Sequence, residues 1–286
     1  MNDGVKRSYE YAIGCFKATS RQPLSAEQWQ RLKSADRAGA EKLLAEFGFP
    51  AVNEECSAVD SIEKDLSSTV AFIRENAPDP ELVDLLFFEQ DALNLKILIK
   101  SARMGQKTPS VELAEGGVDP EVLKVCVAAE DFSLLGKELE RSLAEVPQIT
   151  DPGKLSCVID SAFLAHSVNT ARKKMSFTFA RLLEEYGKGR NRLTALRLKR
   201  LGKDPADYPY AFYPESDKGE KPNDANKSED EIINEVAKAF DGIINDLGFD
   251  EGMGFIARYY FLKKNDASAL RLMFAEKSLG GGVSDE

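Results

Sequence analysis

Apolar positions at helical spacing run through almost the whole chain. Tyr9, Ile13 and Phe16 recur at the spacing that places side chains on one face of a helix. Ile62, Leu66, Val70 and Ile73 repeat this spacing further along. No segment shows the alternation that is typical of a half-buried strand. The pattern therefore predicts an all-α fold.

Polar start signals divide the apolar pattern into separate helices. Ser25 with Gln28, and Ser228 with Glu231, have the spacing of a capping box. Asp-Pro pairs also predict helix starts, because Asp caps the first turn and Pro supplies its φ. These pairs are Asp79-Pro80, Asp119-Pro120, Asp151-Pro152 and Asp204-Pro205. We expect the longest helices at about 152–172, 175–201 and 253–278.

One helix ending recurs three times. Segment 91–105 combines apolar residues at helical spacing, cations in its second half and a closing Gly. Segment 191–202 matches 94–105 position by position, and 266–280 matches 91–105 in the same way. Each of the three ends in Gly. A recurrence of this kind predicts a repeat architecture.

The repeat suggests three helical domains, at residues 1–106, 107–203 and 204–286. Short helices expected at about 120–129 and 133–145 echo the pair expected within 25–47. The third domain lacks such a pair, and a Pro-rich linker at 204–227 stands in its place.

Aromatic residues crowd the first half of the linker. Tyr208, Tyr210, Phe212 and Tyr213 either pack onto their own protein, the interpretation we favour, or form a patch for a partner. The second half is charged and is expected to be flexible, and the tail 280–286 is expected to be frayed.

Composition limits the classes of function. The 286 residues are 43% hydrophobic and 30% charged, with a net charge of −10. This charge argues against nucleic-acid binding and against docking on anionic lipid. No apolar run is long enough for a transmembrane helix, and the N-terminus lacks the apolar core of a secretion signal. Four scattered cysteines favour free thiols in a reducing cytoplasm.

One segment is cationic, although the chain as a whole is acidic. It is interpreted as a solvated helix face, with an acidic partner as the alternative. Its cations are Lys188, Arg190, Arg192, Arg197, Lys199, Arg200 and Lys203.

Catalytic constellations are not found in the sequence. His166 is the only histidine, which excludes multi-His metal sites, and a packed core position rather than a place in a catalytic triad is expected for it. The Gly-Lys-Gly at 187–189 lacks the remainder of a phosphate-binding loop. We therefore expect no catalytic residue, no metal site and no cofactor.

Polar residues inside the recurring helix need another explanation. Asp91 and Asn94 share one face of the helix, although both residue types have mediocre helix propensity. Lys96 follows them. We interpret them as buried polar clasps between neighbouring helices; the alternative is a rim that contacts a partner. The same interpretation extends to residues of the other repeats: Asn191, Arg197, which corresponds to Lys100, Asp266 and Arg271.

Several segments carry a family resemblance, which covers residues 8–278 apart from the linker. Their residues are Leu24, Trp29, Leu32 and Ala35 with Leu43, Leu44, Phe47 and Phe49; Asp91, Asn94, Lys96, Lys100 and Gly105; Ile159, Asp160 and Phe163; and Tyr260, Lys263, Lys264, Asp266, Leu270 and Arg271. In this order they resemble the C subunit of prokaryotic V/A-type rotary ATPases, which is similar to subunit d of the eukaryotic vacuolar enzyme.

The resemblance implies three similar helical domains around a pseudo-threefold axis, forming a funnel. It implies a non-catalytic rotor subunit that couples the central shaft to the membrane proteolipid ring for proton or sodium transport. The expected partners are other subunits of the ATPase, with the chain a monomer within the complex. It would be cytoplasmic and reach the membrane only through that complex, without inserting into lipid.

Two departures and two alternatives accompany the resemblance. Lys188 stands where the first repeat has Asp91, so the clasp of the second repeat must differ. Ser268 and Ala269 replace Leu93 and Asn94 in the third.

The main alternative function is a helical-repeat adaptor whose concave face binds peptides or partner proteins. An all-α enzyme that works without histidine is the other.

Overall fold

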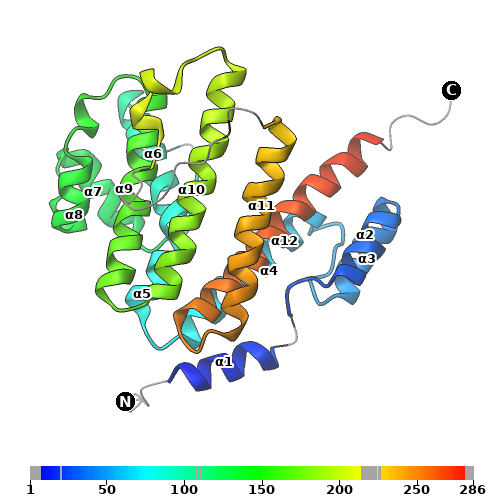
Figure 1. The fold of residues 1–286 in the computed structure, drawn as a ribbon. Helices are drawn as coiled ribbons and strands as arrows, with labels where there is room; N and C mark the ends of the chain where they lie inside the picture. Colours follow the sequence, from blue (N-terminus) through cyan, green and yellow to red (C-terminus); the bar gives the residue numbers. More distant parts are fainter. Residues whose placement is uncertain are drawn as a thin grey trace. The chain divides into compact units, whose positions relative to one another are not determined.

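A computed structural model describes residues 8–19, 21–106, 109, 111–213, 224 and 227–280 (Figure 1). All regular structure in these ranges is helical, and they contain no strand beyond an isolated bridge between Asn53 and Cys56. The predicted all-α fold is confirmed. None of the described helices is both long and apolar enough to cross a membrane.

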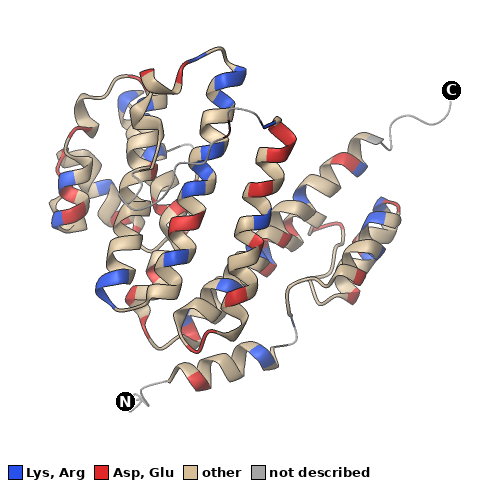
Figure 2. Cartoon of the chain, viewed as in Figure 1, with Lys and Arg blue, Asp and Glu red and all other residues tan. Residues whose placement is uncertain are grey.

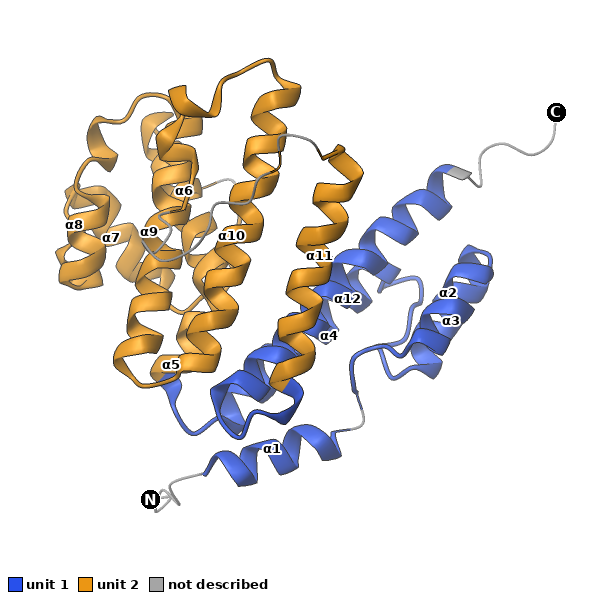
Figure 3. Ribbon diagram, viewed as in Figure 1, with its two compact units in different colours: residues 1–80, 248–286 blue, residues 81–247 orange. Residues whose placement is uncertain are grey.

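The chain forms two compact units (Figure 3). Unit 1 comprises residues 1–80 and 248–286, and unit 2 comprises residues 81–247. Unit 1 therefore joins segments from both ends of the chain. These limits differ from the three ranges expected from the repeat, and the division into three domains stays a prediction.

Unit 1 is built from five α-helices in its described part. These are α1 (Tyr9–Ala18), α2 (Ala26–Ser34), α3 (Arg37–Glu46), α4 (Ala58–Asn76) and α12 (Met253–Gly280). The α2–α3 hairpin packs on α12 and α4 through a cluster that includes Leu32, Leu44, Ile62, Leu270 and Phe274.

Unit 2 contains the remaining α-helices. They are α5 (Pro80–Asp84), α6 (Phe88–Arg103), α7 (Pro120–Ala129), α8 (Lys137–Leu143), α9 (Pro152–Lys173), α10 (Phe177–Arg200) and α11 (Glu229–Asp246). Short 3-10 turns connect them: η1 (Leu85–Phe87), η2 (Ser133–Leu135), η3 (Val146–Gln148), η4 (Pro205–Asp207) and η5 (Pro209–Ala211), with η6 (Leu247–Phe249) at the boundary to unit 1. Helix α9 packs against α6, α8 and α10, and α10 packs against α11.

Most helix starts agree with the capping signals. Ser25 and Ser228 form complete capping boxes, and Asp119 and Asp151 cap α7 and α9 with Pro at the next position. Gly136, at φ 87°, divides the helix expected at 133–145 into η2 and α8. Residues 281–286, most of the tail expected to be frayed, and the charged half of the linker apart from Asp224 and Lys227 lie outside the described residues.

The ends of α6 and α10 are built alike. Gly105 (φ 70°) and Gly202 (φ 66°) adopt the left-handed conformation, which favours glycine. One residue later, the Gln106 N–H donates to the Ser101 carbonyl at 3.0 Å and the Lys203 N–H to the Leu198 carbonyl at 2.9 Å. These bonds satisfy carbonyls that the helix end would otherwise leave open. The recurring Gly is thus a helix stop in both repeats.

Charge is unevenly distributed over unit 2. Figure 2 shows Lys and Arg recurring along α10, whereas Asp and Glu gather at the start of α11. Some of these opposite charges pair with each other: Arg192 on α10 lies 2.8 Å from Glu235 on α11, and Arg200 on α10 lies 2.5 Å from Glu229 on α11.

Candidate functional site

Asp266 on α12 holds the start of the α2–α3 hairpin. Its carboxylate accepts the Leu24 N–H at 2.7 Å and the Trp29 Nε1–H at 3.2 Å. Burial raises the pKa of Asp266 above its usual range, although both hydrogen bonds and the charge of Arg21 act in the opposite direction. Asp266 therefore fixes a loop and a side chain that come from the opposite end of the chain.

Asp91 on α6 makes the corresponding bond in unit 2. Its Oδ1 accepts the Val118 N–H at 3.0 Å, two residues before α7 begins, just as Leu24 lies two residues before α2. The loop passes so close that a Cβ on Gly116 would lie 2.0 Å from Asp91 Oδ1. Because real Cβ atoms do not approach this closely, a side chain at Gly116 would displace the Asp91 carboxylate from the position in which it holds Val118.

Asn94, one turn further along α6, holds the same loop. Its Nδ2 donates to the Ala114 carbonyl at 2.8 Å, and its Oδ1 accepts from Gln90 Nε2 at 2.9 Å. Asn94 is fully buried, so these partners satisfy polar groups that would be costly to leave open.

In the second repeat, where Lys188 stands in place of the aspartate, Asn191 on α10 binds the following chain segment. It binds both backbone groups of Tyr213: the Tyr213 N–H donates to Asn191 Oδ1 at 2.7 Å, and Asn191 Nδ2 donates to the Tyr213 carbonyl at 2.8 Å. The Tyr213 ring lies over Gly187, where a Cβ would be 2.6 Å from Tyr213 Cδ1. Tyr213 thus packs on its own protein, as the favoured interpretation of the aromatic residues expected.

The three Gly-ended helices, α6, α10 and α12, are also joined to long helices by ion pairs. Lys96 on α6 pairs with Asp160 on α9 at 2.7 Å, and Arg271 on α12 pairs with Glu63 on α4 at 2.6 Å. On α10 the pair is formed by Arg192 with Glu235 on α11. Each helix therefore combines a polar bond to a loop with an ion pair to a neighbouring helix.

Most of the predicted site residues make such bonds, but not all in the form expected. Asp91, Asn94, Asn191 and Asp266 bind loop segments, whereas the sequence suggested bonds between helices. Lys96 and Arg271 do connect helices. Arg197 does neither and instead lines a cavity of unit 2.

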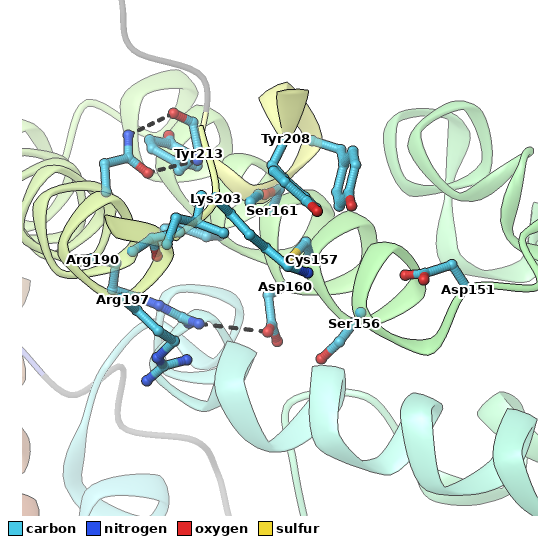
Figure 4. A pocket seen from close by; sticks show the side chains of 17 residues that line it. Asp151, Ser156, Cys157, Asp160, Ser161, Arg190, Arg197, Lys203, Tyr208 and Tyr213 are labelled. Carbon is cyan, nitrogen blue, oxygen red and sulfur yellow. Dashed lines mark hydrogen bonds and ion pairs between the residues drawn. The ribbon is translucent and has the colours of Figure 1, made fainter. Parts of the chain in front are cut away.

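The cavity has a volume of about 450 Å³ and lies within unit 2 (Figure 4). Helices α9 and α10 form its walls, and the arm, residues 203–213, closes another side. Its cations are Arg190, Arg197 and Lys203, and its acids are Asp151 and Asp160. Figure 4 shows Arg190 joined to Asp160 and the Lys203 side chain extending past Tyr208 toward Cys157. A cavity of this size can hold a ligand or a few side chains of a partner.

A buried ionic cluster in unit 1 has no counterpart among the predicted site residues. Asp65 on α4 lies 2.8 Å from Lys263 Nζ and 3.1 Å from Arg21 Nε. The Lys263 side chain is 0% exposed, and burial, together with the charge of Arg21, lowers the pKa of Lys263 to about 8. The Arg21 guanidinium lies 3.8 Å from the centre of the Phe49 ring. The only signal in the sequence is a lysine that follows the apolar Tyr259-Tyr260 pair by helical spacing.

His166 is half-buried on α9 and is not part of the core, contrary to the expectation. Its Nδ1 lies 3.7 Å from Glu138 Oε2, too far for a hydrogen bond. Burial lowers the pKa of His166, although the Glu138 charge opposes the shift. Among the described residues, no group of three or more His, Cys, Asp or Glu side chains has the arrangement of a metal site.

The comparison with protein families gives a match. The family described as ATP synthase (C/AC39) subunit matches residues 16–239, which is well over half of the chain. The chain belongs to this family. A comparison with curated proteins finds no match.

Membership places the chain among subunits of the V/A-type ATPases, as the resemblance implied. The matched range includes the clasps made by Asp91, Asn94 and Asn191 and every residue that lines the cavity. Asp266 and Arg271 lie beyond its end.

Proposed function

We propose that the chain is a non-catalytic central-stalk subunit of a V/A-type rotary ATPase, which couples the central shaft to the membrane proteolipid ring. The observation that supports this most directly is the family match over residues 16–239. In this role the protein passes torque between partners and carries out no reaction of its own.

The proposal includes the three repeats 1–106, 107–203 and 204–286. In this division, α6 of the first repeat holds the loop of the second, α10 of the second holds the arm of the third, and α12 of the third holds the loop of the first. The ion pairs follow the same order. This closed order supports a pseudo-threefold funnel, because an open solenoid would have no bond from its last repeat to its first.

The clasps suit a component under load. A buried carboxylate that accepts backbone N–H groups, or an amide bound to both backbone groups of Tyr213, fixes a loop relative to a helix with little freedom. A torque-bearing subunit needs this stiffness where segments distant in sequence meet. We therefore assign Asp91, Asn94, Asn191 and Asp266 to the scaffold of the subunit.

The proposed partners are the shaft subunits and the proteolipid ring, with the chain present as a monomer in the complex. It would lie on the cytoplasmic side and reach the membrane only through these partners. The net charge of −10 favours protein contacts over direct contact with anionic headgroups.

Affinity purification of the tagged full chain from its native cell tests the proposal. We expect mass spectrometry to identify shaft and proteolipid subunits of one rotary ATPase, while the purified chain alone hydrolyses no ATP. An unrelated acidic helical protein with the same tag is the control. Capture of unrelated peptides without ATPase subunits would support the adaptor instead, and ATP turnover by the pure chain would contradict a non-catalytic role.

A further inference from the structure

The cavity of unit 2 has cations that its own acids do not neutralise. Its lining has three cations, Arg190, Arg197 and Lys203, against two acids. Asp160 is engaged by Lys96 at 2.7 Å and by Arg190 at 3.5 Å, and Asp151, which caps α9, also acts on Lys203 through its charge. Arg197 forms no ion pair with any residue in the described part of the chain. Together with Lys203, it gives the cavity a positive charge in a protein of net charge −10.

Two tyrosines form an aromatic wall beside these cations. The rings of Tyr208 and Tyr210 meet edge to face at 5.8 Å, and Lys203 Nζ lies 4.7 Å from the centre of the Tyr208 ring. Lys154 Nζ lies 5.9 Å from the Tyr210 ring on the α9 side. Tyrosine and arginine are the residue types enriched where proteins bind one another.

Hydroxyl groups complete the lining. Ser156, Ser161 and Thr194 face the cavity from α9 and α10, and their side chains make no hydrogen bond with the described residues. Other helical serines of the chain behave differently: Ser268 Oγ donates to the Lys264 carbonyl one turn back at 3.0 Å. The cavity hydroxyls are therefore available as donors to a ligand.

We propose that this cavity binds a carboxylate-bearing peptide segment of a partner polypeptide. Arg197 and Lys203 bind the carboxylate, the hydroxyls donate to it, and Tyr208 and Tyr210 contact the aliphatic part of the segment. The tyrosines favour a peptide over a small anion, because a free anion has no apolar surface to place against them. The inference rests on the proposed function in one respect: the partner is taken to be another subunit of the complex.

Cys157 provides a reporter inside the cavity. It is a free, half-buried thiol on α9, and burial raises its pKa. Its alkylation by iodoacetamide is measured by mass spectrometry relative to Cys15, a half-buried free thiol on α1 in unit 1. The probe is an acetylated and amidated tetraglutamate peptide, compared with tetraglutamine and with succinate, all added to the full chain.

Tetraglutamate is expected to slow alkylation of Cys157 at least severalfold and to leave Cys15 unchanged. The variants Arg197→Gln and Lys203→Gln should each weaken this protection about tenfold, the loss expected for a charge-assisted bond. Lys199→Gln is the matched control, because Lys199 is an exposed cation of α10 that does not line the cavity.

Three outcomes would overturn the inference. They are equal protection by tetraglutamine, equal protection by succinate, which would indicate a small-anion site, and equal loss in Lys199→Gln, which would indicate nonspecific charge attraction. Far-ultraviolet circular dichroism of each variant establishes that it is folded. Failure of this experiment leaves the purification of ATPase subunits unaffected, so the two proposals can be judged separately.

Discussion

At the scale of single residues, the most demanding arrangement is the ionic cluster in unit 1. Asp65 faces Lys263 at 2.8 Å and Arg21 at 3.1 Å, and only 9% of the Asp65 side chain is exposed. Two cations thus share one buried carboxylate, with the charge of Asp266 adding a second, weaker attraction on Lys263. Removing a single partner from such a cluster leaves buried charge without compensation.

We expect Asp65→Asn to lower the free energy of unfolding by about 3–5 kcal/mol, because Lys263 and Arg21 lose their carboxylate. Glu63→Gln is the matched control on the same helix. Its pair with Arg271 is half-exposed, so its loss should cost no more than about 1 kcal/mol. Urea unfolding of both variants measures the difference, and equal losses would show that the buried cluster contributes no more than a surface pair.

At the scale of elements, close packing of loops on helices explains several glycines. Gly116 and Gly117 let a loop pass Asp91, and Gly187 lets the Tyr213 ring lie on α10. Gly242 on α11 is different, because a Cβ there would meet nothing within 4 Å. Glycine in an open helix position only adds conformational freedom to the unfolded chain.

Alanine at Gly187 and alanine at Gly242 should therefore have opposite effects on stability. Gly187→Ala would place a Cβ 2.6 Å from Tyr213 Cδ1 and is expected to cost about 1–3 kcal/mol of stability, because Asn191 holds the tyrosine in place. Gly242→Ala is expected to stabilise the protein by about 0.5–1 kcal/mol. Urea unfolding again gives both values, and a gain in Gly187→Ala would mean that the arm does not need its contact with α10.

At the scale of the whole molecule, the clasps belong to different compact units. Asp266 holds Leu24 within unit 1, and Asp91 holds Val118 within unit 2. Because each unit has its own buried core, opening one clasp should affect the unit that contains it more than the other.

Hydrogen exchange of the full chain tests this division. Asp266→Ala should speed exchange at Leu24 and along α2, and leave the segment around Val118 nearly unchanged. Asp91→Ala should do the reverse, because alanine offers no acceptor to either amide. If either variant sped exchange equally in both units, the molecule would open as one cooperative body.

The sequence by itself determined the all-α fold, the positions of most helix starts and the membership suggested by ordered motifs. These features depend on local chemistry: Ser25 and Gln28 cap a helix together, and Asp151-Pro152 starts one, whatever lies elsewhere. The recurring Gly was also visible, because a helix stop needs only neighbouring residues. The candidate clasp residues could also be named from local sequence, because Asp and Asn are polar residue types with mediocre helix propensity inside a helix.

Only the tertiary structure decided what those residues bind. Asp266 and Leu24 are 242 positions apart, and the bond is to a backbone amide, which has no side chain to mark it in the sequence. The helical spacing of Lys263 after Tyr259-Tyr260 does not by itself indicate complete burial, and Arg197 has no local sign that it faces a cavity. Such properties arise when distant segments pack together, and local propensity contains no information about that packing.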